Sequence, residues 1–205
     1  MRDVDLVSGF PAGINVAATF NRNLIQQRGI AIAEEFRVKG AHVYLGPAMD
    51  VIRAPEAGRL WESFGADTYL AGECAYATIT GVQSVGVQAC AKHLILNSQE
   101  TYRFLESSNT DQRTLMEKYF APFWRAVDAD VGCVMCSYNR VNDTYACENP
   151  ALIGESGLLK KTVGFKGFVV SDWGATHGSP ADNANAGLDV ECVACFPCLN
   201  RNVYS

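Results

Sequence analysis

The sequence predicts an α/β fold in which parallel β-strands alternate with helices. Four apolar runs rich in β-branched residues start roughly 35–45 residues apart, and helix-type patterns fill the intervals between them. Three of the runs end in charged or hydrogen-bonding side chains. Unbroken apolar runs are typical of strands buried on both faces. Crossovers of this length predict a right-handed parallel sheet, open or closed into a barrel, with its chemistry beyond the carboxyl ends of the strands.

The predicted strands are HVYLGP (42–47), VQACAKHLI (87–95), VGCVMCSYN (131–139) and GFVVSDW (167–173), and a weaker fifth candidate is LDVECV (188–193). A closed eight-stranded barrel needs about 250 residues. The chain has 205 residues, so we expect an incomplete barrel.

Three helices are predicted over 21–40, 66–86 and 110–132. In the first, Ile25, Ile32 and Phe36 share one face, and Gly40 ends the helix. In the third, Thr110 or Asp111 can cap the start and Pro122 predicts a kink. A further helix, short or weak, begins after Asn149-Pro150.

Composition excludes several classes of protein. The chain is 48% hydrophobic and 19% charged, which predicts a buried core rather than disorder. Its net charge is −5 and no Lys/Arg cluster occurs, which argues against nucleic acid and an anionic membrane surface as partners. No apolar run is long enough to span a membrane. The first residues, MRDVDLVSGF, carry charges where a signal peptide needs its apolar core, so we expect no export signal in the chain as written.

Asp172 is the strongest single candidate for chemistry. It follows the apolar run GFVV and precedes Trp173. A carboxylate at the mouth of a parallel sheet can attack an anomeric carbon, and an indole suits the apolar face of a sugar ring. The alternative is a carboxylate that caps the next helix or binds a loop N–H.

Further polar candidates end the other strands. Lys92 and His93 could recognise hydroxyls or a carboxylate, provided that the backbone turns there; the alternative is a salt-bridged lysine beside a core histidine. Arg59, in PEAGRLWESF, could grip vicinal hydroxyls, or it could be solvated or paired with Glu56 or Glu62. Tyr138 could form an aromatic wall with a hydroxyl, or belong to the core.

The chain contains eight cysteines, which is many for a cytosolic enzyme. Cys192, Cys195 and Cys198 resemble the start of an iron–sulfur or zinc spacing, but the fourth thiol is missing, so the signal for a metal is weak. Cys136 and Cys147 bracket a loop that carries the glycosylation sequon at Asn142, which suits a disulfide. Sequon and cysteines together favour a secreted parent protein.

Read together, the motifs resemble glycoside hydrolase family 3, and most closely its fungal β-glucosidases. The resemblance runs from about residue 8 to about residue 190. It is carried by FPAGINVAATF, EEFRVKGAHVYLGPAMD, GR-x-WE, ACAKH, QE-x-x-R, SSN, DQRTL, VMCSYNRVNDTYACEN and GFKGFVVSDWGATH followed by AGLDV.

This resemblance implies part of a (β/α)8 barrel over 1–190, followed by a divergent, Cys-rich tail over 191–205. It implies a secreted, retaining, exo-acting β-glucosidase that needs no cofactor and hydrolyses terminal β-D-glucosyl residues of cello-oligosaccharides or other β-glucosides. Asp172 matches the nucleophile and Tyr138 the tyrosine near it. Trp173 matches the aromatic beside the scissile bond, whereas Arg59, Lys92 and His93 match residues that hold glucose hydroxyls.

The family's acid/base glutamate comes from a following α/β sandwich domain, which we do not expect in this chain. We therefore expect weak or no hydrolysis by the chain alone. Two other functions compete with this one: a non-catalytic or vestigial carbohydrate-binding protein, and a thiolate metal protein.

Overall fold

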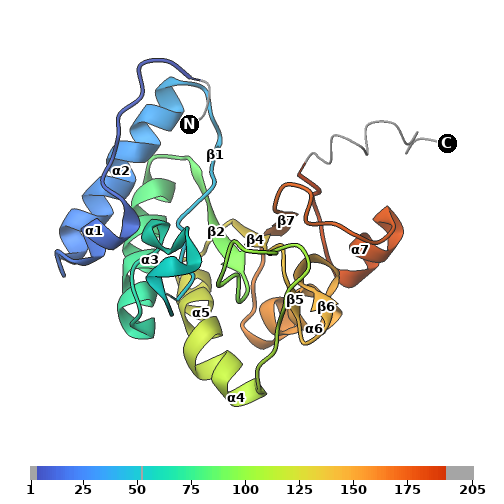
Figure 1. Cartoon of the computed structure of the whole chain (residues 1–205). Coiled ribbons are helices and arrows are strands. Elements are labelled where there is room, and N and C mark those ends of the chain that lie inside the picture. The colour runs from blue at the N-terminus through green and yellow to red at the C-terminus, as the bar shows by residue number, and fades with distance from the viewer. Residues whose placement is uncertain (1–3, 52, 193–205) are drawn as a thin grey trace.

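Four parallel strands form the central sheet in the order β1-β2-β4-β7 (Figure 1). The computed structural model describes residues 4–51 and 53–192. The strands are β1 (Val43–Tyr44), β2 (Gln88–Leu94), β4 (Cys133–Cys136) and β7 (Phe168–Ser171). Each pairs in parallel with the next strand of this sheet along the chain. This is the order that successive βα units give on the way round a barrel, and it confirms the predicted α/β fold.

Helices α1 (Gly13–Ala17), α2 (Arg22–Val38), α3 (Thr68–Ser84) and α5 (Ala121–Asp128) lie on one side of the sheet (Figure 1). Side-chain caps start the two long ones. The Asn21 side chain accepts from the Leu24 N–H, and the Asp67 side chain accepts from the Leu70 N–H. The helices predicted over 21–40 and 66–86 are therefore confirmed.

Alternate residues of the strands enter two different apolar clusters. Ala89, Ala91, Val134 and Val169 belong to the large core shared with the helices. On the opposite face, a smaller cluster contains Cys90, Cys133, Met135 and Val170, each at most 4% exposed. Burial of both faces explains why the strands read as unbroken apolar runs.

The third predicted helix is interrupted where Pro122 enters it. A short α4 (Gln112–Thr114), capped by Asp111, leads into wide π-type turns over Leu115–Phe120, and α5 then begins at Ala121. Proline has no N–H to give to the carbonyl four residues earlier. That carbonyl, of Lys118, instead accepts a hydrogen bond of 3.1 Å from the Thr68 hydroxyl of α3.

A second, three-stranded sheet was not predicted. Its strands are β3 (Ser107–Ser108), β5 (Arg140–Val141) and β6 (Thr144–Tyr145), in the order β3-β5-β6. Asn142 and Asp143 turn the chain between β5 and β6 with φ values of 48° and 69°. Two-residue strands carry no detectable periodicity, which is why the sequence does not reveal them.

The remaining elements are short, and one predicted strand is largely missing. They are α6 (Pro150–Ile153), π-type turns at Leu158–Thr162, α7 (Pro180–Ala186), and 3-10 turns at Pro55–Ala57, Leu60–Glu62 and Ala146–Glu148. The strand predicted over 188–193 is reduced, within residues 188–192, to one parallel bridge between Val190 and Val170 of β7. The Asp189 carboxylate accepts from the Val169 N–H and so takes a position that a strand would need. Val193 lies outside the described residues.

None of the helices in the described ranges is long and apolar enough to cross a membrane.

Candidate active site

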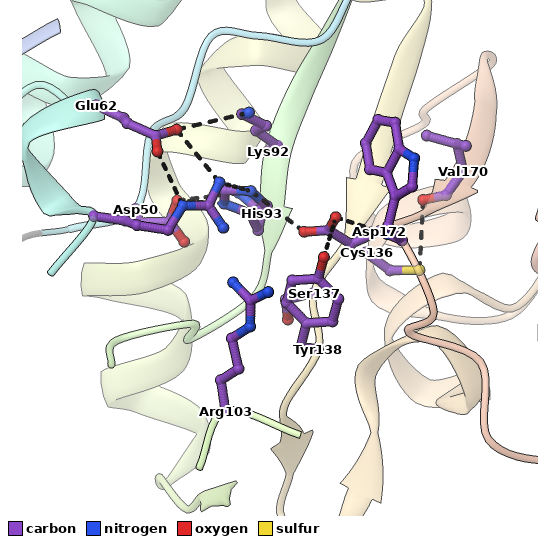
Figure 2. Close-up of polar contacts among 12 residues, drawn as sticks. Asp50, Glu62, Lys92, His93, Arg103, Cys136, Ser137, Tyr138, Val170 and Asp172 are labelled. Atoms are coloured by element: carbon purple, nitrogen blue, oxygen red, sulfur yellow. Dashed lines mark hydrogen bonds and ion pairs between the residues drawn. The ribbon is translucent and has the colours of Figure 1, made fainter. Parts of the chain in front are cut away.

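The polar residues that end the predicted strands meet at the carboxyl end of the sheet (Figure 2). Asp172 follows β7, Tyr138 lies two residues after β4, and Lys92 and His93 lie near the end of β2. Arg59 comes from the loop after β1. The parallel topology therefore brings these five side chains into one cluster, as expected from the positions of the strand ends.

The two oxygens of Asp172 differ in their surroundings. Oδ1 accepts two hydrogen bonds of 2.7 Å, one from the Tyr138 hydroxyl and one from the Trp173 N–H. Oδ2 is buried and has no hydrogen-bond partner among the residues that the structure describes. Its near neighbour is His93 Nε2 at 3.5 Å. One oxygen thus holds the carboxylate in place, and the other keeps its lone pairs available.

Tyr138 is held as a proton donor to Asp172. Burial, and then the hydrogen bond to the Asp172 carboxylate, raise the pKa of Tyr138. The Arg103 guanidinium lies 4.1 Å from the centre of the tyrosine ring, and Glu100 Oε2 accepts from Arg103 Nη1 at 2.8 Å. This cation–π contact fixes the ring whose hydroxyl supports the carboxylate.

Arg59 and Lys92 share the carboxylate of Glu62, and Figure 2 shows Lys92 pointing toward it. Arg59 Nε lies 2.9 Å from Glu62 Oε1, and Lys92 Nζ lies 3.7 Å from Oε2. Burial alone would raise the pKa of Glu62, but the two cations and His93 outweigh it and lower the pKa. Burial lowers the pKa of Lys92, although Glu62 opposes that shift. Glu56, the other proposed partner of Arg59, is exposed.

His93 lies between two carboxylates. Its Nδ1 is 2.9 Å from Asp50 Oδ2, and the same oxygen accepts from the His93 backbone N–H at 3.2 Å. Its Nε2 is 3.3 Å from Arg59 Nη2. The Lys92–His93 peptide bond is cis, and the register of β2 against β4 shifts between Ala91 and Leu94. Both side chains reach the cluster, as the hypothesis of a shared ligand requires.

Trp173 borders the cluster and is 48% exposed, so one side of its side chain is open to solvent. The loop that follows is tied down by Glu148, whose Oε1 accepts from the N–H groups of His177 and Gly178 at 2.6 and 2.5 Å. The His177 ring also stacks on Tyr145, with centres 3.7 Å apart.

The cysteine and sequon predictions concern residues other than the five of this cluster. Cys136 and Cys147 are joined by a disulfide, and so are Cys90 and Cys133. Asn142 is exposed, and its amide pairs with the backbone of Thr110. In the described part of the chain, no group of three His, Cys, Asp or Glu side chains is arranged to hold a metal. Cys195 and Cys198 lie outside that part.

Sequence reasoning did not single out Asp50, Glu100 or Arg103. Asp50 ends the segment LGPAMD, and Glu100 and Arg103 are the charged members of the QE-x-x-R element. These positions mark motifs, but the contacts of Asp50 with His93 and of Arg103 with Tyr138 arise only when separate loops meet.

The sequence matches the profile of the glycosyl hydrolase family 3 N-terminal domain over residues 3–198. A probable β-glucosidase L of Emericella nidulans is 52% identical over 191 residues, which cover 93% of this chain and 26% of that protein. A solved β-glucosidase structure from Chaetomella raphigera is 50% identical with a TM-score of 0.86, and covers 92% of this chain.

A Streptomyces venezuelae β-glucosidase, solved in complex with D-glucose, is 35% identical with a TM-score of 0.87 and covers 91% of this chain. The chain spans about a quarter of the length of the relatives it matches. Profile, identity and fold agree with the motifs on the strands, and the chain belongs to glycosyl hydrolase family 3.

Proposed function

We propose that this chain is part of the catalytic domain of a retaining, exo-acting β-glucosidase, with residues 1–190 forming part of the barrel and 191–205 a divergent tail. The observation that carries the proposal is the asymmetric environment of Asp172. Two hydrogen bonds to Oδ1 fix the carboxylate, while Oδ2 faces the cluster of cations without a hydrogen-bond partner among the described residues. A nucleophile needs this combination of fixed direction and free lone pairs.

In the proposed first step, Asp172 Oδ2 forms a bond to the anomeric carbon while the glycosidic C–O bond breaks. The leaving oxygen takes a proton from an acid. Water then attacks the glycosyl-enzyme, gives its proton to the same group acting as base, and releases glucose and the carboxylate. Oδ1 keeps its two donors throughout, so the carboxylate does not rotate.

The cations recognise the sugar in this proposal. Lys92 and Arg59 are anchored by Glu62, so each can point a donor at a hydroxyl at little entropic cost. His93 is anchored by Asp50 and presents its Nε2 to the same hydroxyls. The half-exposed Trp173 would stack on the group that leaves. We propose that the substrates are β-glucosides such as cello-oligosaccharides, and that the parent protein is secreted.

The acid is proposed to come from outside this chain. The Glu62 carboxylate is held by the cations Arg59 and Lys92, which lower its pKa despite its burial and make it a poor proton donor, and the Asp50 carboxylate is occupied by His93. Loss of the general acid typically costs about 10²–10⁴-fold in rate. The same observation favours a second candidate function, in which the chain binds a glucosyl unit without turnover.

The test is covalent trapping. We expect 2,4-dinitrophenyl 2-deoxy-2-fluoro-β-D-glucoside to label the purified chain, because its leaving group needs no acid. Peptide mass mapping should place the label on Asp172. The Asp172→Asn variant should take up no label, although its unfolding transition should match that of the parent chain. A label on another residue, or none on folded protein, would contradict the assignment of the nucleophile.

Titration with gluconolactone separates the two candidate functions. Binding together with labelling supports the nucleophile; binding by folded chain that is never labelled supports the carbohydrate-binding alternative. Turnover of p-nitrophenyl β-glucoside at the rate of a complete enzyme would contradict an external acid.

A further inference from the structure

A small cavity lies beside His93 and Asp50. It is lined by Asp50, His93 and Asn97 together with apolar side chains that include Val51, Leu96 and Phe123. It leaves about 10 Å³ for the centre of a water molecule. A space of this size suits one water and no larger ligand.

Two buried oxygens on this cavity lack donors. Asp50 Oδ1 and Asn97 Oδ1 have no hydrogen-bond partner among the described residues. Bulk water hardly reaches either residue, because the Asp50 side chain is 8% exposed and Asn97 is 7% exposed. A buried acceptor left without a donor destabilises the folded chain, and a charged acceptor does so more strongly. Both groups line the same small space, so one species could satisfy both.

The chemistry of the two acceptors selects the ligand. Neither can donate to the other while Asp50 is ionised. A water molecule has two O–H donors, which is the number required here, and it adds no charge beside the His93 ring.

We propose that one water molecule bridges Asp50 Oδ1 and Asn97 Oδ1, and that Asp50, completed by this water, is a positioning residue that holds His93 with its proton on Nδ1. The choice of tautomer follows from the contacts. Asp50 Oδ2 already accepts from the His93 backbone and lies 2.9 Å from Nδ1. The lone pair of Nε2 is then free to accept from Arg59 Nη2 at 3.3 Å.

The consequence for the sugar site rests on the proposed function. The His93 ring, held by Asp50, presents Nε2 to the cluster in one orientation and as one tautomer. The water carries no catalytic step; it keeps the Asp50 carboxylate supplied with donors on the side that His93 does not reach.

The tautomer can be read directly by ¹⁵N NMR of histidine-labelled chain. The sequence has three histidines, and His42 and His177 are exposed, so His42→Gln and His177→Gln assign the spectrum. We expect the neutral His93 ring to carry its proton on Nδ1, and Asp50→Leu to move the proton to Nε2. Asp50→Asn, nearly isosteric, covers the case in which the leucine variant does not fold, and should weaken the Nδ1–H preference.

The water can be counted by magnetic relaxation dispersion of the solvent nuclei. Asn97→Leu should remove one long-lived water, because leucine fills the space and takes away one acceptor. Asn109→Leu, at an exposed position, is the matched control and should remove none.

The proposal is overturned by an unchanged count of long-lived waters in folded Asn97→Leu, by an Asn97 amide that donates directly to Asp50, or by a His93 tautomer that does not respond to Asp50→Leu or Asp50→Asn. None of these measurements requires sugar binding. Failure here is therefore distinguishable from failure of the nucleophile assignment, which the trapping experiment reports.

Discussion

The two ends of the parallel sheet are held by different kinds of interaction. At the carboxyl end, charged side chains contact one another within a largely buried cluster: Glu62 with Arg59 and Lys92, and His93 with Asp50. At the amino end, the neutral amide of Gln83 in α3 links the starts of β2 and β4. It accepts from the N–H groups of Ala89 and Gly132 and donates to the carbonyl of Asp130.

The amino end also carries an open groove of about 490 Å³, bordered by Gln88, Asp130, Lys166 and Phe168. Its charged members are Asp130, Lys166 and Asp189, and Asp189 Oδ1 lies 3.5 Å from Lys160 Nζ. Largely buried ion pairs thus gather where the sugar is proposed to bind, whereas a neutral amide links the starts of the strands at the other end. Substitutions at the two ends should therefore act on different quantities.

Glu62→Gln tests the carboxyl end of the sheet, and we expect it to have the largest effect on ligand binding. The amide cannot balance Arg59 and Lys92, and the loss of a charge-assisted hydrogen bond is worth about 1.5–3 kcal/mol. We expect gluconolactone to bind about 10–100-fold more weakly by calorimetric titration. Glu56→Gln, in the same loop but exposed, is the control and should leave the affinity unchanged. Equal affinities for both variants and the parent chain would show that Glu62 does not organise the site.

Gln83→Ala tests the amino end. It removes three hydrogen bonds and leaves backbone groups without partners, so we expect the free energy of unfolding to fall by about 2–3 kcal/mol in urea titrations. The labelling rate of Asp172 should stay within a factor of about two, because the site lies at the other end of the strands. Gln27→Ala, at an exposed helical position, should change stability by about 0.5 kcal/mol or less. A labelling rate that falls with stability would mean that the two ends are coupled.

The smallest expected effect concerns Glu106, beside the Glu100–Arg103 pair. Burial, and then the charge of Glu100, raise the pKa of Glu106 to about 7. Between its ordinary pKa of 4.5 and about 7, the folded chain therefore binds a proton that the unfolded chain has released. Stability should fall as the pH rises through this interval and level off above it.

Glu106→Gln should flatten that part of the stability profile. We expect the difference between pH 5 and pH 8 to shrink by about 1 kcal/mol, less than the full linkage value because solvent still reaches the side chain. Urea unfolding at both pH values measures it, with Glu56→Gln as the reference. An unchanged profile in the Glu106 variant would show that the carboxyl is ionised throughout.

Much of the architecture could be predicted because the four strands are buried on both faces. Their unbroken apolar runs and the caps at Asn21 and Asp67 are local signals. The short β3-β5-β6 sheet and the π-type turns before Pro122 are not, because they depend on partners distant in the chain.

The site residues at the strand ends could be predicted from the sequence, but the residues that hold them in place could not. For several residues the structural and the functional alternatives predicted from the sequence are both present in the structure. Lys92 is salt-bridged and also reaches the cluster, and Asp172 accepts a loop N–H and still exposes Oδ2 to the cluster. Asp50 and Arg103 act through contacts between separate loops, and no spacing in the sequence announces such contacts.

The loop after Asp172 is connected to β4 by a disulfide and two hydrogen bonds. Cys136 ends β4 and is bonded to Cys147, and the next residue, Glu148, grips the backbone of His177 and Gly178. The segment that follows Asp172 is thus connected to the neighbouring strand β4 through one disulfide and one carboxylate. Residues 145–148 contact this loop directly although they are distant from it in the chain. A loop exchanged between relatives should therefore be replaced together with residues 145–148.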